Sequence, residues 1–143
     1  MKKQSGFTLV VVIVILGILA ATALPRFINL TNEARAAAVN GMAGGLRSGV
    51  AVIQSRYMAT GVLTATSVTT MDGTSVTVNA GTGIPVGTSA GIGNALTSLD
   101  GFTVSYTAPA AVTFQPTNGG KATCGITYNG TSGVVAVDVS GYS

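Results

Sequence analysis

An uncharged apolar run near the N-terminus constrains the fold of this chain more than any other feature. Residues 7–24 read FTLVVVIVILGILAATAL and contain no charged side chain. As a helix this run would be about 27 Å long, which is enough to cross the hydrocarbon core of a bilayer. Lipid offers the backbone no hydrogen-bond partner, so the run would be helical there despite its β-branched centre. Lys2 and Lys3 precede it in the basic segment 1–6 and predict a cytoplasmic N-terminus.

Residues 25–59 predict a second, amphipathic stretch of the same helix. We expect a helix break at Gly17 and at Pro25, because proline cannot donate the regular hydrogen bond of a helix interior. One row of apolar residues recurs about once per turn beyond the proline and predicts a face that packs on a sheet. The residues of this row are Ala34, Ala38, Met42, Leu46, Val50 and Ile53.

A second row on this helix consists of small residues, namely Ala37, Gly41, Gly45 and Gly49. Each interior glycine costs about 1 kcal/mol relative to alanine, so the row needs a compensating role. A smooth ridge of small side chains lets another backbone approach closely. Two interpretations stay open: the ridge fits the helix against its own sheet, or it packs between subunits.

The composition changes at about residue 60, and residues 60–143 are rich in Gly, Thr, Ser and Val. Asp72-Gly73 predicts a hairpin turn, and IGNALTSLD predicts a short helix. Four later runs alternate or are β-branched and predict strands: FTVSYT, AVTFQ, ATCGITY and VVAVDVS. The fold class expected is therefore α+β, with a long N-terminal helix packed on an antiparallel sheet of four to six strands.

Composition and residue types argue against several function classes. The net charge of +3 comes from the N-terminal lysines and scattered arginines, so no concentrated basic face is available for nucleic acid. The chain has no histidine and its aspartates are isolated, so we predict neither an enzyme nor a metal or cofactor site. Cys124 is the single cysteine, which leaves it unpaired within the chain, and we expect it to be a small buried residue.

The segment KKQSGFTLVVVIVILGILAATALPRF resembles the N-terminus of type IV prepilins. The resemblance implies a leader of residues 1–6, cleavage between Gly6 and Phe7 by a prepilin peptidase, and N-methylation of Phe7. It also implies the type IV pilin fold. The run VVVIVILGILAATALPRFINL, followed by EAR, is most similar to the mannose-sensitive haemagglutinin type of major pilin.

The same resemblance implies a function and a location. A type IV pilin is held in the inner membrane of a Gram-negative bacterium. A pilus assembly machinery then builds it into a helical homo-oligomeric filament on the cell surface, where the filament serves attachment, biofilm formation or motility.

The chain departs from the family pattern at two places. Pilins carry Ile-Glu-Leu between the positions of Leu9 and Val10, and no acidic residue lies between Phe7 and Glu33 here. In the family this glutamate meets the N-terminal amine of a neighbouring subunit. Many pilins also close a C-terminal loop with two cysteines, whereas Cys124 has no partner.

Two alternatives remain open from the sequence. One is a pseudopilin of a type II secretion system, a class that often carries a calcium site near the C-terminus. The other is a secreted soluble β protein, because residues 21–23 read ATA and satisfy the cleavage pattern of an ordinary signal peptide.

Overall fold

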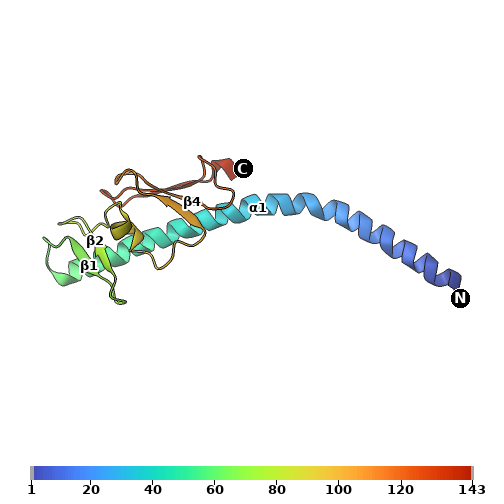
Figure 1. Ribbon diagram of the computed structural model, residues 1–143, viewed down its shortest axis with the longest axis horizontal. Coiled ribbons are helices and arrows are strands. Elements are labelled where there is room, and N and C mark those ends of the chain that lie inside the picture. The colour runs from blue at the N-terminus through green and yellow to red at the C-terminus, as the bar shows by residue number, and fades with distance from the viewer. Residues whose placement is uncertain (1, 143) are drawn as a thin grey trace. The chain divides into compact units, whose positions relative to one another are not determined.

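A computed structural model describes the backbone of residues 2–142 and the side chains of residues 5–21 and 31–142. The chain divides into two compact units, residues 1–34 and residues 35–143. One helix, α1 (Lys2–Thr60), belongs to both units, and all the strands belong to the second (Figure 1). The α+β class predicted from the sequence is confirmed.

Helix α1 is continuous from Lys2 to Thr60, so the helical backbone passes through Gly17 and the predicted break there is wrong. A single glycine lowers helix propensity without removing a hydrogen bond, which is why the helix tolerates it. The helical backbone also continues through Pro25, so the break predicted there is wrong as well, although the side chains of residues 22–30 are not described.

The strands of the second unit form two antiparallel sheets. Strands β1 (Ser67–Thr69) and β2 (Ser75–Thr77) make a hairpin in which Val68 pairs with Val76. The turn between them includes Gly73 at φ 88°, as the Asp-Gly signal predicts. The larger sheet has the order β3-β4-β5-β6, with strands β3 (Phe102–Ser105), β4 (Val112–Pro116), β5 (Gly125–Tyr128) and β6 (Val135–Asp138).

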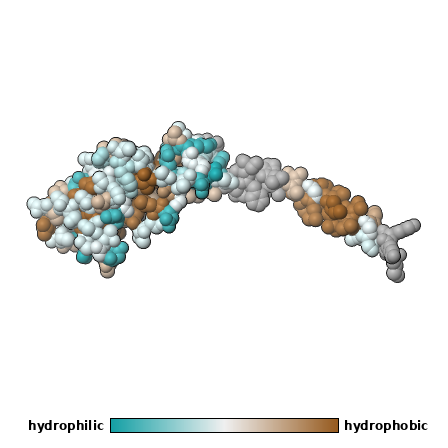
Figure 2. All heavy atoms as spheres, in the orientation of Figure 1, coloured by the Kyte–Doolittle hydropathy of each residue, from teal (hydrophilic) through white to brown (hydrophobic). Residues whose placement is uncertain are grey.

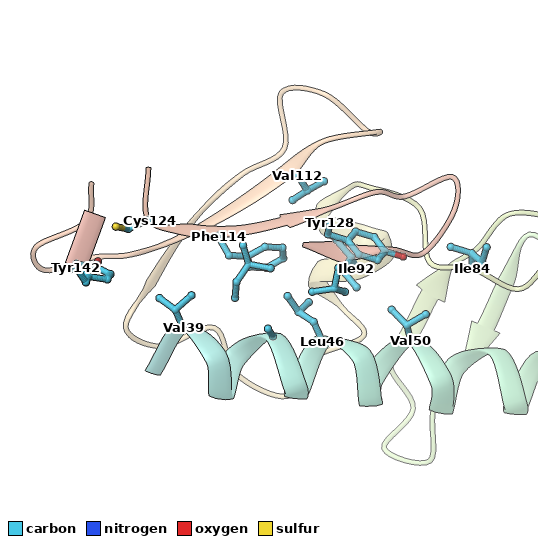
Figure 3. Packing of buried hydrophobic residues seen from close by; sticks show 13 residues of the cluster. Val39, Leu46, Val50, Ile84, Ile92, Val112, Phe114, Cys124, Tyr128 and Tyr142 are labelled. Carbon is cyan, nitrogen blue, oxygen red and sulfur yellow. The ribbon is translucent and has the colours of Figure 1, made fainter. Parts of the chain in front are cut away.

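Two apolar clusters join helix α1 to the sheets. In the larger one, side chains of the helix point at the inner face of the four-stranded sheet, with Leu46 below Phe114 and Tyr128 (Figure 3). In the smaller one, Ile53 and Tyr57 pack with valines of the β1–β2 hairpin. The alternation of strand β4, in which Val112 and Phe114 are buried and Thr113 is half-buried, follows from the period of two along a strand.

The buried face of α1 consists of Val39, Ala43, Leu46, Val50, Ile53 and Tyr57. Leu46, Val50 and Ile53 of the predicted row lie in this face and Met42 is half-buried, but Ala34 and Ala38 are exposed. The expectation was wrong for these two alanines, because a strict four-residue spacing drifts by about 40° per step around the helix. Alternating steps of four and three residues keep the true face aligned with the sheet.

The short helix predicted in IGNALTSLD is also misplaced. A single turn of π-helix, η1 (Ser89–Gly93), precedes most of that segment, and the hydroxyl oxygen of Thr88 accepts a hydrogen bond from the N–H of Gly91 at its start. The side chain of Asn94 then donates to the carbonyl of Ser75 on strand β2. This tertiary bond, together with poor helix formers such as Thr97 and Ser98, ends the helix early.

Candidate functional site

The most unusual surface of the molecule is the apolar part of helix α1. Every residue from 5 to 21 is exposed, and the large side chains range from Val11 at 41% to Phe7 at 73%. Figure 2 shows this stretch as a continuous brown surface, whereas the second unit is mostly pale or teal. No side chain between residues 5 and 21 is charged. A helix that is apolar on all sides is stable only when something covers it.

The energetic demand for a cover is large. Burial of a Val, Leu, Ile or Phe side chain is worth about 1.5–3 kcal/mol. Eleven such residues between Phe7 and Leu19 are exposed. Even partial cover would therefore contribute on the order of 10 kcal/mol per subunit. Such a continuous surface is an interaction site, for lipid or for other chains.

No helix within the part of the chain that the structure describes is both long and apolar enough to cross a membrane. The membrane segment predicted over residues 7–24 extends into residues 22–30, whose side chains are not described, and it stays a prediction.

The residues at the predicted leader junction lie on this uncovered surface. Phe7 is exposed, and a Cβ placed on Gly6 would meet no other atom within 4 Å. Both residues belong to the helical part of the chain. The cleavage and methylation roles implied by the resemblance remain predictions.

The ridge of small residues lies mostly away from the sheet. Ala37, Gly41 and Gly45 are exposed, and a Cβ on either glycine would meet nothing within 4 Å. Gly49 differs, because a Cβ there would come 3.3 Å from the carbonyl oxygen of Ala95. Gly49 thus meets the loop after η1, and none of these four residues is shown packed against a sheet.

A hollow of about 520 Å³ lies in the second unit between α1, the β1–β2 hairpin and the loop after η1. Its carboxylate is Asp72, which accepts hydrogen bonds from the hydroxyl of Thr70 and from the N–H of Thr74 at 3.0 Å. The Thr70 hydroxyl, and then the Thr74 groups, lower the pKa of Asp72. The ionised carboxylate of Asp72 accepts its hydrogen bonds from residues of its own turn, so its role is to stabilise that turn.

The described residues hold no candidate metal centre. They include no group of three or more His, Cys, Asp or Glu side chains that could hold a metal ion. Asp138 lies beside a smaller hollow of the sheet and accepts hydrogen bonds from the hydroxyl and from the N–H of Ser140. The hydroxyl, and then the N–H, lower the pKa of Asp138. Like Asp72, it stabilises a turn.

The C-terminal segment is fastened to the loop between β4 and β5, which the sequence did not reveal. Lys121 Nζ donates to the carbonyl of Gly141 at 2.6 Å, and the hydroxyl of Tyr142 donates to the carbonyl of Gly119 at 3.1 Å. Cys124 is a free thiol, 1% exposed, in the core beside this segment. No local pattern encodes these contacts, because each joins residues about twenty positions apart.

These features define a class of protein: an α+β chain whose N-terminal helix presents an uncovered apolar half and whose C-terminal half carries the sheets. Over 69 residues the chain is 42% identical to the type IV narrow pilus major component PilA5 of Thermus thermophilus. The match covers 46% of this chain, and the chain spans 58% of the length of that relative. No family model matches the chain, and no solved structure matches it at a significant level.

The identity to this pilin supports the type IV pilin family over the matched part of the chain. The helix packed on an antiparallel sheet is consistent with the pilin fold. The finer likeness to mannose-sensitive haemagglutinin pilins gains no support from this relative.

Proposed function

We propose that this chain is the structural subunit of a type IV pilus and polymerises through its N-terminal helix. The observation that carries the proposal is the uncharged helical surface of residues 5–21, which no described part of the chain covers. The similarity to a major component of a type IV narrow pilus supports it. Its role is structural, and filament assembly supplies the cover that the helix requires.

The subunit is made as a precursor with residues 1–6 as leader. A prepilin peptidase cleaves after Gly6, and Phe7 becomes the methylated N-terminus of the mature subunit. The accessibility of both residues on the helix surface supports this step. Residues 7–24 hold the precursor in the inner membrane, with Lys2 and Lys3 on the cytoplasmic side.

Assembly transfers the apolar helix from lipid to a bundle of identical helices. This exchange replaces one apolar environment by another, so its net free energy is small and an assembly machinery drives it. The exposed ridge of Ala37, Gly41 and Gly45 then lets a neighbouring helix approach closely in the filament.

The polar face of the second unit lies on the outside of the filament and meets surfaces or other cells. The finer assignment, a mannose-sensitive haemagglutinin type of pilin of a Gram-negative bacterium, rests on the run 10–30 and on the EAR motif that ends at Arg35. No observation favours the pseudopilin or the soluble secreted protein over a pilus subunit.

Mass spectrometry of filaments sheared from the cell surface tests the proposal. We expect a mature chain that begins with N-methylated Phe7 and that is present in the filament fraction. A mature chain that begins at Leu24, recovered in the soluble fraction, would instead show an ordinary signal peptide and would contradict the proposal.

A further inference from the structure

The sequence contains three Asn-Gly pairs, and the structure places them in three different environments. They are Asn40-Gly41 in helix α1, Asn118-Gly119 in the loop between β4 and β5, and Asn129-Gly130 in the loop between β5 and β6. Asparagine before glycine is the pair most prone to spontaneous ring closure, because a glycine N–H is the least hindered backbone nucleophile. The reaction also requires that this N–H and the asparagine amide be free to move.

Only the pair in the β4–β5 loop meets these requirements in the described part of the chain. Asn118 is exposed, and neither its side chain nor the N–H of Gly119 makes a hydrogen bond. In the other loop, the side-chain oxygen of Asn129 accepts from Thr131 and Ser132, and the N–H of Gly130 donates to Pro109 at 3.1 Å.

The pair in the helix is protected in another way. The N–H of Gly41 belongs to the interior of α1, where each N–H bonds to the carbonyl four residues earlier. Attack on the side chain of Asn40 would require the helix to open locally, although that side chain is exposed. The three pairs therefore form an internal series, with one reactive and two protected members.

The loop conformation at residue 119 requires a glycine, and this glycine makes Asn118 prone to ring closure. Gly119 has φ 72°, a conformation that favours glycine, and a Cβ there would collide with the guanidinium of Arg35. Arg35 is half-buried and makes no ion pair with a carboxylate among the described residues. The guanidinium of Arg35 therefore lies against the residue that follows Asn118, and it lacks an anionic partner in the described part of the chain.

We propose that Asn118-Gly119 is a site of spontaneous deamidation, which adds a carboxylate at the residue before the one that Arg35 contacts. The backbone nitrogen of Gly119 attacks the side-chain amide carbon of Asn118, a C–N bond forms, and ammonia leaves with the proton of the Gly119 N–H. Water then opens the succinimide at one of its two carbonyls and yields aspartate or isoaspartate. The whole change consumes one water and releases one ammonia.

The product alters the contacts that hold the C-terminal segment. The hydroxyl of Tyr142 bonds to the carbonyl of Gly119, so an isoaspartate, which lengthens the backbone by one carbon, shifts the group that accepts this bond. Deamidation also lowers the formal net charge of the chain by one. It is an irreversible, time-dependent change on the surface of the second unit.

Trypsin separates the three pairs, because Arg47, Arg56 and Lys121 place them in the peptides 36–47, 57–121 and 122–143. The full-length chain, kept in detergent micelles at mildly alkaline pH, is digested at intervals and analysed by mass spectrometry. We expect progressive conversion of peptide 57–121 to a product one mass unit heavier. We expect the other two peptides to convert at least about tenfold more slowly.

Asn118→Ser is the matched variant, because it removes the amide and keeps Gly119. We expect it to abolish conversion of peptide 57–121, which also contains Asn79 and Asn94. Unfolding the parent chain in urea should bring peptide 122–143 to a rate similar to that of 57–121. Equal rates for the loops in the folded chain, no conversion of 57–121, or unchanged conversion in Asn118→Ser would each overturn the proposal.

Discussion

At the scale of single residues, a buried tyrosine hydroxyl helps to hold the second unit together. The hydroxyl of Tyr128 is buried and donates to the carbonyl of Pro85 at 2.6 Å, which ties the larger sheet to the loop before η1. Burial raises the pKa of Tyr128 well above its usual range. A buried hydroxyl that is bonded contributes to stability, and the same burial disfavours its ionised form.

We predict that Tyr128→Phe lowers the free energy of unfolding by about 1 kcal/mol at neutral pH, because it removes one buried hydrogen bond. The pKa of Tyr128 is higher in the folded than in the unfolded chain. The Tyr128 hydroxyl therefore makes its full contribution to the free energy of unfolding below about pH 10, and this contribution is lost as the pH rises further. Urea unfolding at neutral and alkaline pH measures both effects.

The variant should lose less stability than the parent between neutral and strongly alkaline pH. Tyr106→Phe is a suitable control, because Tyr106 is less buried and burial raises its pKa by less. The prediction would be contradicted if the parent and Tyr128→Phe lost the same free energy of unfolding between neutral and alkaline pH. The pKa of the Tyr128 hydroxyl would then be the same in the folded and unfolded chains.

At the scale of secondary structure, the helix face and the strands were predictable from periodicity, but the contacts between them were not. The strand runs and the Asp72-Gly73 turn carry their signals locally, and Leu46, Val50 and Ile53 lie on a helix face that pattern alone locates approximately. Ala34 and Ala38 were misplaced because a row at strict four-residue spacing drifts away from the buried face, which passes through Val39.

Other features depend on the assembled fold. The π-helical turn at Ser89–Gly93 is held by a bond from Asn94 to strand β2, nineteen residues away in sequence. The position of Arg35 against Gly119 is likewise a tertiary contact. Of the candidate site, the apolar run and its need for a cover were readable from the sequence, because they depend on residue type alone.

We predict that Leu46→Ala lowers the free energy of unfolding of the second unit by about 2–5 kcal/mol, because it leaves a cavity beneath the sheet. Leu46 is completely buried among side chains of the sheet. Ala38→Ser, on the exposed side of the same helix, should change stability by less than about 0.5 kcal/mol. Thermal or urea unfolding followed by circular dichroism measures both. Equal effects would contradict the assignment of the buried face.

We predict that Gly41→Ala and Gly45→Ala each raise the stability of the isolated chain by up to about 1 kcal/mol, because alanine favours a helix and finds open space there. Gly41→Leu should leave the isolated chain folded and reduce the number of surface filaments severalfold, because a large side chain keeps a neighbouring helix away. Unfolding curves and filament counts by electron microscopy measure these effects.

The control for the ridge is Asn40→Leu, a change to the same residue at an exposed position about 100° around the helix from Gly41. It should leave the filament number close to that of the parent. A filament number in Gly41→Leu equal to that of the parent would show that the ridge does not lie between subunits.

At the scale of the whole molecule, an apolar helix without a cover precedes a second unit whose apolar side chains are largely buried. The apolar surface of residues 5–21 has no charge, and the family pattern would place one glutamate within it. A filament core without this carboxylate leaves the N-terminal ammonium of each subunit unpaired in apolar surroundings, which is costly.

We predict that insertion of Ile-Glu-Leu between Leu9 and Val10 increases the number of surface filaments severalfold, because the carboxylate pairs with that ammonium. Insertion of Ile-Gln-Leu restores the same helical spacing without the charge and should give a smaller gain. Filament counts per cell by electron microscopy compare the three chains. Equal counts would show that the filament tolerates the absence of the glutamate.

The central claim is that filament assembly covers the apolar helix, and a cryo-electron microscopy reconstruction of surface filaments from cells that produce this chain tests it most directly. We expect residues 7–21 of each subunit to lie at the filament axis, packed against the same residues of neighbouring subunits, with the second unit outside. Filaments that lack this chain, or that leave residues 7–21 exposed to solvent, would contradict it.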